Sequence, residues 1–426
     1  MAGENVILDP STALTAPEVL DLGVSRPVPD VFYGAAYDGG DPLTGCPHAR
    51  TPAGDEVVII RGRNDVMAVL AHTAFSLAEV PEEAALTGAT LQGEYGLLRR
   101  DRPDITGVRR LMAPYMRAQA LETYQPGLEA AAREAVNFVQ RRFDQASATG
   151  HGIDLAEFVR VFLPQAATAT FGLTEAEWGD IRDYSAETLS PVTSPARMTS
   201  MRDSWQGLYD YTQALIENKS QQPDGLLLSN MIAGLKEGGI EGQELVQTVA
   251  SFLDGIPTIE AIFTVCLAEL LQHPQAIQAC LDDPARWEAT VAELLRHKAH
   301  FTFASPRIAR EDITLPSGIR IKAGQVVVAS LTAALDDQSQ LGEDYDPHAF
   351  DPDAPASRIL AFGAGSHRCP ADELSTLWLC IGLKELFTTI PDISLHSPLP
   401  PYHGSALPTP FVVPAIRGRD LAGVAK

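Results

Sequence analysis

Apolar residues recur three and four positions apart through most of the chain from about Arg109 to Glu293. This spacing places them on one face of an α-helix, so a series of helices is expected there. A further helix is expected from Asp372 through Leu383, directly after a glycine-containing loop. The clearest helical patterns in the central region are Leu121–Arg142, Trp205–Asn218 and Glu244–Gln272.

Short runs rich in valine and isoleucine, which are typical of β-strands, lie on both sides of the helical region. The first is Glu56–Ile60, and a helical pattern follows it from Asn64 or Asp65 to His72. Turn residues separate the later runs, which are Arg307–Ala309, Ile313–Leu315, Ile319–Ile321 and Val326–Val328. Many helices with a small sheet predict an α+β fold that is predominantly α. Because proline and glycine are scattered and no repeat occurs, residues 1–426 are expected to form one domain.

Composition narrows the class of protein. The chain has 32 basic and 55 acidic residues, a net charge of −23, which argues against binding to nucleic acid. It has no run of eighteen apolar residues, and its start lacks the basic and apolar runs of a signal peptide, so a cytoplasmic protein without a membrane segment is expected. The cysteines are odd in number and lack C-x-x-C spacing, which argues against disulfides or structural zinc: Cys46, Cys266, Cys280, Cys369 and Cys380.

Cys369 has the neighbours of a metal ligand. It lies in the segment 362–371, FGAGSHRCPA, immediately before the expected helix. There its sulfur would gain the helix dipole and free backbone N–H groups, with Pro370 in the first turn. His367 and Arg368 would add positive charge, and the two glycines of the segment would let the backbone approach a flat partner. This arrangement would hold a cysteine as the anionic axial ligand of a haem iron, whereas an isolated cysteine in a cytosolic chain is more often structural.

The segment resembles the cysteine-loop signature of the cytochromes P-450, F-G-x-G-x-H-x-C-x-G, and departs from it only at Ala371. Glu293 and Arg296 match the E-x-x-R pair of that family, and they share a helical face. Phe350-Asp351-Pro352 between that pair and the cysteine strengthens the match, and the element order extends the resemblance over nearly the whole chain. The resemblance implies the family's fold, with helices around haem b and a small β-rich region. It also implies that Cys369 ligates the iron beside Phe362 and Gly363.

The haem propionates need cations, and the resemblance assigns three residues to them: Arg109, Arg307 and His367. The family usually adds a histidine four residues before the first of these, where this chain has Ile105. The alternative for Arg109 is a solvated helix charge, because Arg110 adjoins it.

The segment Ser251–Glu260 resembles the family's oxygen-binding helix, A-G-x-D/E-T. It keeps the glycine and threonine, has Asp254 where a small residue is usual, and has Pro257 where the acid is usual. The proline removes a backbone donor, which costs about 3 kcal/mol in a straight helix, and therefore predicts a kink. The resemblance makes Thr258 catalytic. Asp254, one turn earlier, is a displaced proton-relay acid, an anionic contact for the substrate, or a residue that points away from the haem.

Register with the family suggests a substrate pocket. Because two histidines and Lys298 would make its wall unusually polar, we expect a polar small molecule that bears an amine or a carboxylate. The pocket residues suggested in this way are Leu253, Ile256, His297, His300, Phe301 and Leu407.

The resemblance implies a haem-thiolate monooxygenase that uses dioxygen and electrons from a separate ferredoxin or flavodoxin and its reductase. A tailoring step on a natural product is the leading hypothesis. The missing acid at position 257 leaves a second one open, namely coupling, ring formation, dehydrogenation, nitration or peroxide-driven chemistry. A third is a non-catalytic helper of a glycosyltransferase, against which the retained Cys369 argues. The oligomeric state stays open.

Overall fold

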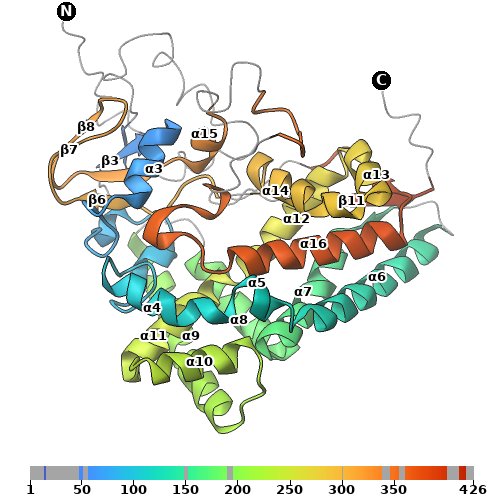
Figure 1. Cartoon of the computed structure of the whole chain (residues 1–426), viewed down its shortest axis with the longest axis horizontal. Coiled ribbons are helices and arrows are strands. Elements are labelled where there is room, and N and C mark those ends of the chain that lie inside the picture. Colours follow the sequence, from blue (N-terminus) through green and yellow to red (C-terminus); the bar gives the residue numbers. More distant parts are fainter. Residues whose placement is uncertain are drawn as a thin grey trace, which may run out of the picture.

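The computed structural model describes residues 14–15, 48–50, 56–147, 152–189, 195–299, 301–337, 346–354, 360–400 and 412–418. Helices make up most of it, and a smaller β-rich part lies at one side (Figure 1). The predicted fold class, predominantly α within α+β, is confirmed.

The β-rich part holds a six-stranded sheet in the order β1-β2-β3-β9-β6-β4. Its centre pairs β3 with β9 in parallel and β9 with β6 in antiparallel orientation, which brings together strands from both sides of the helical region. The first strand and the four later runs predicted from the sequence are all confirmed. The strands of this sheet are β1 (Leu14–Thr15), β2 (His48–Arg50), β3 (Glu56–Ile60), β4 (Phe75–Ser76), β6 (Arg307–Ala309) and β9 (Val326–Ala329).

Two smaller sheets complete the β-structure. One is a hairpin of β7 (Ile313–Thr314) and β8 (Arg320–Ile321). The other is three-stranded, with β11 (Pro414–Arg417) between β10 (Ile393–Leu395) and β5 (Ile153–Asp154).

The helices pack around one large apolar core in which α7 and α12 meet. There the rings of Phe158, Phe162 and Phe263 lie 5.7 to 5.9 Å apart. The α-helices are α3 (Arg63–Ala71), α4 (Asp104–Met112), α5 (Ala118–Leu121), α6 (Gln125–Ser147), α7 (Ala156–Phe171), α8 (Glu175–Thr188), α9 (Pro195–Gln221), α10 (Leu227–Glu237), α11 (Gly242–Gly255), α12 (Thr258–Leu270), α13 (Pro274–Asp282), α14 (Trp287–His297), α15 (Leu331–Leu335) and α16 (Asp372–Thr389). Short 3-10 turns cover Glu82–Ala84, Gly88–Leu91, Ala113–Tyr115, Pro284–Arg286, Leu360–Phe362 and Gly365–His367.

The long helix expected over residues 244–272 is broken in two. α11 ends at Gly255 and α12 starts at Thr258. Around the break, Ile256 N–H donates to the Leu253 carbonyl at 3.1 Å, a bond to the third residue back in place of the fourth. Because Pro257 has no N–H to donate, the helix cannot continue regularly, and the predicted kink is confirmed.

The stretch Gly242–Leu270 is also long and apolar enough to span a membrane by length and composition. However, 72% of its most apolar window is buried inside the fold, as in a core helix of a globular protein.

Glu293 and Arg296 form a buried ion pair on α14. Arg296 Nε and Nη2 donate to the two carboxylate oxygens at 2.8 and 2.7 Å, and both side chains are at most 1% exposed. The same pair holds the segment 346–354, because Arg296 donates to the Pro347 carbonyl and Glu293 accepts from the Asp351 N–H. The pair thus links α14 to the chain that leads toward the cysteine loop.

Candidate functional site

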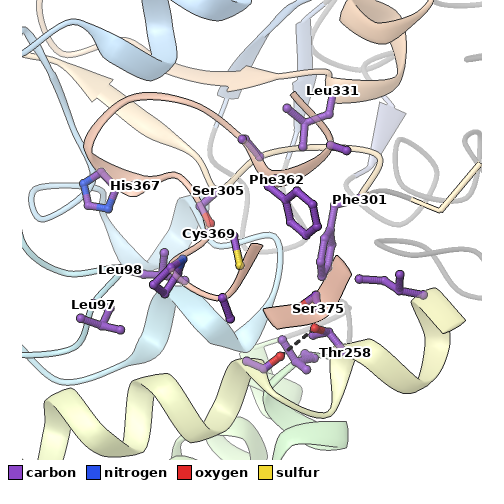
Figure 2. A pocket seen from close by; sticks show the side chains of 18 of the residues that line it. Leu97, Leu98, Thr258, Phe301, Ser305, Leu331, Phe362, His367, Cys369 and Ser375 are labelled. Atoms are coloured by element: carbon purple, nitrogen blue, oxygen red, sulfur yellow. Dashed lines mark hydrogen bonds between the residues drawn. The ribbon is translucent and has the colours of Figure 1, made fainter. Parts of the chain in front are cut away.

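A cavity of about 330 Å³ lies between the β-rich part and helices α11, α12 and α16. Cys369 and Thr258 both line it, together with the rings of Phe301 and Phe362 (Figure 2). Most of the lining is apolar, and no carboxylate lines it among the described residues. The ionisable residues that do line it are Arg307, His367 and Cys369.

The cysteine loop, defined as residues 362–371, is shaped by two glycines with positive φ. Gly363 has φ 72° and Gly365 has φ 71°, a region that side chains disfavour. A Cβ on Gly363 would meet nothing within 4 Å, so its Cα faces the cavity, where a flat group fits. A Cβ on Gly365 would instead lie 2.3 Å from the Leu70 carbonyl oxygen of α3. Gly363 therefore leaves space on the cavity side of the loop, whereas Gly365 allows the loop to pack closely against α3.

The loop turns back on itself through a 2.8 Å hydrogen bond from the Cys369 N–H to the Phe362 carbonyl. Helix α16 begins at Asp372 with Ala371 as its N-cap. The prediction that Pro370 occupies the first helical turn is therefore wrong, since the proline precedes the N-cap.

The protein alone does not hold Cys369 as a thiolate. Burial raises the pKa of this thiol to about 11, although the Ala371 N–H and the charges of Arg109 and Arg368 act in the opposite direction. His367 adds no positive charge, because burial and the neighbouring cations lower its pKa to about 4. The predicted contribution of His367 to the anion is therefore wrong, whereas the backbone N–H and Arg368 act in the predicted direction. A coordinated metal cation is the partner that deprotonates such a thiol.

Two arginines near the cysteine loop form no ion pair within 4 Å in the described part of the chain, although Asp101 attracts Arg307 and Asp372 attracts Arg109 electrostatically. Arg307 on β6 is 4% exposed, and the one hydrogen bond found there runs from Nη1 to the Ser305 carbonyl at 3.1 Å. Burial lowers its pKa to about 10, which still leaves it charged at neutral pH. Arg109 on α4 is half-buried and interacts electrostatically with Cys369, whereas Arg110 is exposed. The interpretation of Arg109 as a solvated charge is therefore not supported.

The helix break forms the wall with Thr258. The Thr258 hydroxyl donates to the Gly255 carbonyl at 2.7 Å, and Gly255 and Ile256 also line the cavity. A Cβ on Gly255 would meet nothing within 4 Å, so this part of the wall is open toward the cavity. Of the predicted pocket residues, Ile256 and Phe301 line the cavity.

Asp254 does not line the cavity. Its carboxylate is 1% exposed and accepts hydrogen bonds from Thr188 Oγ1 of α8 and from Gln92 Nε2, the latter at 3.2 Å. Burial raises its pKa to about 6. The two expectations that place this acid over the haem are wrong, because its face of α11 packs against α8. Leu253, which is fully buried, does not line the cavity either.

The polar wall expected from the histidines is also not found. His297 turns away from the cavity toward Glu269 and the His348 carbonyl, at 2.9 Å from each. His300 and Leu407 lie outside the described residues. The prediction of a polar substrate therefore loses the support of His297.

Three lining residues on the first turns of α16 are not singled out by any motif: Leu374, Ser375 and Trp378. They are separated by one, three and four positions, so they share one face of the helix. This spacing is the sequence signal that could have predicted that they point in the same direction. The buried indole Nε1 of Trp378 has no partner among the described residues. Ser251 of α11 also lines the cavity, and its hydroxyl donates to Gln92 Oε1 at 2.6 Å.

Residues 287–388, which hold the Glu293–Arg296 pair and the cysteine loop, match the family described as Cytochrome P-450. The chain is 29% identical over 355 residues to the mycinamicin IV hydroxylase/epoxidase of Micromonospora griseorubida, covering 82% of this chain and 86% of that protein. The chain belongs to the cytochrome P-450 family. The nocardicin C N-oxygenase of Nocardia uniformis subsp. tsuyamanensis is 27% identical to this P-450 over 380 residues, or 86% and 90% of the two chains.

A solved P-450 with biaryl coupling reactivity has a TM-score of 0.78 and 21% identity, covering 95% of this chain and 100% of that one. At this identity the likeness shows the shared fold. Two further bacterial relatives are monooxygenases by name, and this chain is a P-450 oxidoreductase of the monooxygenase type.

Membership of the family implies haem, and the residues of the cavity fit that group. Haem is a flat macrocycle with two carboxylates, and the cavity has apolar walls, an open Gly363 surface and a thiol. The cation of Arg307 is buried, and its one hydrogen bond within the described residues goes to the Ser305 carbonyl, so a propionate would compensate the cost of its burial. Arg109 lies close to the same loop.

Proposed function

We propose that this protein binds haem b through the Cys369 sulfur and inserts oxygen into a small, largely apolar molecule. The observation that carries the proposal is one cavity with a cysteine sulfur on one wall, a broken helix with Thr258 on another, and the buried Arg307 cation at its edge. The balanced reaction takes a substrate C–H bond, dioxygen, two electrons and two protons to an alcohol and water.

The propionates would be bound from the β-rich side and from α4. Arg307 and Arg109 are suited to this role because a guanidinium donates two parallel hydrogen bonds to a carboxylate. His367 would lie beside the propionates without a charge, because its pKa is lowered to about 4 and its ring is hydrogen-bonded to the Leu97 backbone. Phe362 and Gly363 would lie against the macrocycle. Ile105, where the family often has histidine, is buried and adds no donor.

When bound, haem with a cysteine-sulfur ligand supplies the activation of dioxygen. The residues of the chain supply orientation and protons. Because the Thr258 hydroxyl donates to the Gly255 carbonyl, its own oxygen remains free to accept a hydrogen bond from a water in the cavity. Thr258 is thus the residue that would hold and pass a proton at the helix break. Asp254 would act as a buried support of the wall, because its carboxylate is bonded to Thr188 and Gln92.

The lining favours an apolar substrate. Leu86, Leu97, Phe301 and Leu331 are among the residues that face the cavity, and the polar ones near the helix break are uncharged. The relatives act on elaborate natural products, as the names mycinamicin IV hydroxylase/epoxidase and nocardicin C N-oxygenase state. We infer a tailoring step on a natural product. Similarity to an N-oxygenase is the remaining support for an amine-bearing substrate.

A second hollow borders the same cysteine loop, and we propose that the electron carrier docks there. It is lined by Phe362 and Arg368 of the loop, and by the start and outer face of α16. Six carboxylates and three cations line it: Glu122, Glu129, Glu288, Asp372, Glu373 and Glu385, against Arg133, Arg368 and Lys384. This excess of negative charge favours a ferredoxin or flavodoxin with basic groups at its docking face. We infer that the P-450 itself is a cytoplasmic protein of one domain.

A second candidate function rests on one observation. No carboxylate lines the cavity among the described residues, and Pro257 stands where the family usually has an acid. Proton delivery for ordinary hydroxylation then depends on Thr258 and water. Other reactions would depend less on this proton delivery, namely coupling, ring formation, dehydrogenation, nitration or peroxide-driven oxidation.

The test uses the full chain expressed with ample haem precursor. We expect a red-shifted ferrous–carbon monoxide band, and turnover of apolar natural-product scaffolds with NADPH and surrogate ferredoxin and reductase. Turnover with hydrogen peroxide alone, and not with NADPH, would replace the first candidate with the second. Protein that binds no haem and co-purifies with a glycosyltransferase would overturn both in favour of a helper role.

A further inference from the structure

Two histidines and a glutamate meet at a junction of helices away from the haem cavity. Glu269 lies in the last turn of α12, His273 is the N-cap of α13, and His297 is the last residue of α14. Glu269 Oε1 is 3.0 Å from His273 Nε2 and 2.9 Å from His297 Nδ1. One ligand atom from each residue lies within 4.8 Å of the other two. None of these residues lines the haem cavity.

The hydrogen bonds of His297 raise a question about its Nδ1 atom. Its Nε2 lies 2.9 Å from the His348 carbonyl oxygen, which can only accept, so Nε2 must carry a proton. In the neutral ring, Nδ1 then presents a lone pair directly to the Glu269 carboxylate at 2.9 Å. Two acceptors at this distance need a cation between them. That cation is either a proton on Nδ1 or a metal ion.

The surroundings match the outer partners of a metal site. Ligating histidines commonly donate their second ring N–H to a backbone carbonyl, as His297 does to His348. The other oxygen of the carboxylate, Glu269 Oε2, accepts from Gln272 Nε2 at 3.0 Å, which orients Oε1 toward the histidines. The ring of Phe350 stacks on His273 at a centroid distance of 4.1 Å and restricts its rotation.

We propose that Glu269, His273 and His297 bind a zinc ion, with water as the fourth ligand. Two imidazoles and one carboxylate are a common zinc ligand set. Ligands about 2.0–2.2 Å from zinc in tetrahedral geometry stand roughly 3.4 Å apart, so the side chains separate by a few tenths of an ångström on binding. His273 is 30% exposed at its side chain, which leaves a path for the ion. The proposal is independent of the haem and of the reaction.

Such an ion would crosslink three successive helices and stabilise their junction. α12, α13 and α14 would be joined to one another directly, and to the segment 346–354 through the bond from His297 to the His348 carbonyl. The same segment is held by the Glu293–Arg296 pair. Metal binding would therefore stabilise the folded chain, by an amount that grows with the logarithm of the free zinc concentration once this exceeds Kd.

The test measures zinc in full-length holoprotein that has been purified without a metal-affinity tag and treated with a chelator. Haem iron is counted separately from the optical spectrum. Titration with zinc against a chromophoric indicator should give one equivalent at micromolar zinc, and magnesium should not compete. X-ray absorption at the zinc edge should show nitrogen and oxygen ligands only, which excludes the free cysteines as the site.

The variants His273→Gln and His297→Gln should each weaken zinc binding at least about tenfold, by analogy with losses at metal sites. His72→Gln is the matched control, because the His72 ring accepts from the Ala74 N–H and lies outside the junction. If the variant at the buried His297 fails to fold, the variant at the partly exposed His273 still provides the test. Less than one tenth of an equivalent of zinc, or equal affinity in the wild type and both histidine variants, would overturn the proposal in favour of a protonated His297.

Discussion

The cysteine loop and the helix break form two walls of the same cavity, yet they are built in opposite ways. The loop is one continuous stretch of ten residues that carries its own turn, its own glycines and the sulfur. The wall at the break depends on residues far apart in the chain, since Gln92 and Thr188 determine the direction of Asp254. A local motif therefore reveals what the loop does. At the break, local sequence reveals the kink and not the direction of the side chains.

The two walls also differ in charge. The cation Arg307 lies on the side of the β-rich part, whereas Ser251, Gly255 and Thr258 at the break are neutral. The one acid of the break, Asp254, is buried behind the wall. The arrangement suits an anionic cofactor at the loop and an apolar substrate beneath the helix break.

The largest effect is expected from removal of the sulfur. Cys369→Ala should abolish the red-shifted ferrous–carbon monoxide band, because an alanine offers no ligand. Cys380→Ala is the control, since Cys380 lies on α16 and does not line the haem cavity. A red-shifted band retained in Cys369→Ala would remove this residue from the ligand role.

The next largest effect is expected from loss of the buried Glu293–Arg296 ion pair, which holds the segment that leads toward the cysteine loop. Glu293→Gln should destabilise the fold by about 3–5 kcal/mol, because Arg296 would remain buried without its carboxylate. Denaturation by urea measures this loss. The exposed pair Arg182–Asp183 offers the contrast, and Arg182→Gln should cost less than about 1 kcal/mol. Equal losses in the two variants would show that burial of the first pair does not matter.

At the break, stability should depend on pH through Asp254. Its pKa is about 6 in the folded chain and 3.8 ordinarily, so the folded state disfavours the charged form. Stability is thus lost as pH rises from about 4 to above 6. Asp254→Asn should be more stable than the wild type by up to about 3 kcal/mol at pH 7.5, with the gap closing at pH 4. Thermal unfolding across this range tests it, and parallel profiles would contradict it.

The smallest change in stability, but a specific change in chemistry, is expected from Thr258→Ala. Loss of one hydrogen bond should cost at most about 1 kcal/mol. If the alcohol handles protons, more of the electrons consumed should appear as hydrogen peroxide. Thr264→Ala is the matched control, because Thr264 donates to the Glu260 carbonyl on the same helix and does not line the cavity. Unaltered peroxide release in Thr258→Ala would assign proton delivery to ordered water alone.

Several site predictions made from the sequence failed for one physical reason. Register on a helix states which residues share a face, but not which face meets the cavity. Asp254 and Leu253 are one and two residues away from the lining Gly255, and packing of α11 against α8 turns both away. His297 follows Arg296 directly, yet its ring is captured by Glu269 from a helix that is 28 residues away.

The sequence by itself determined the alternation of helices and short strands, the break at Pro257, the geometry of the Glu293–Arg296 pair and the loop around Cys369. Each of these depends on residues that are close in the chain, where backbone preferences and side-chain spacing act directly. Only the tertiary structure decided the direction of Asp254, the neutral state of His367, the burial that raises the pKa of the Cys369 thiol, and the meeting of Glu269 with its two histidines. Those depend on burial and on partners brought together by packing, and neither is written in any local stretch of residues.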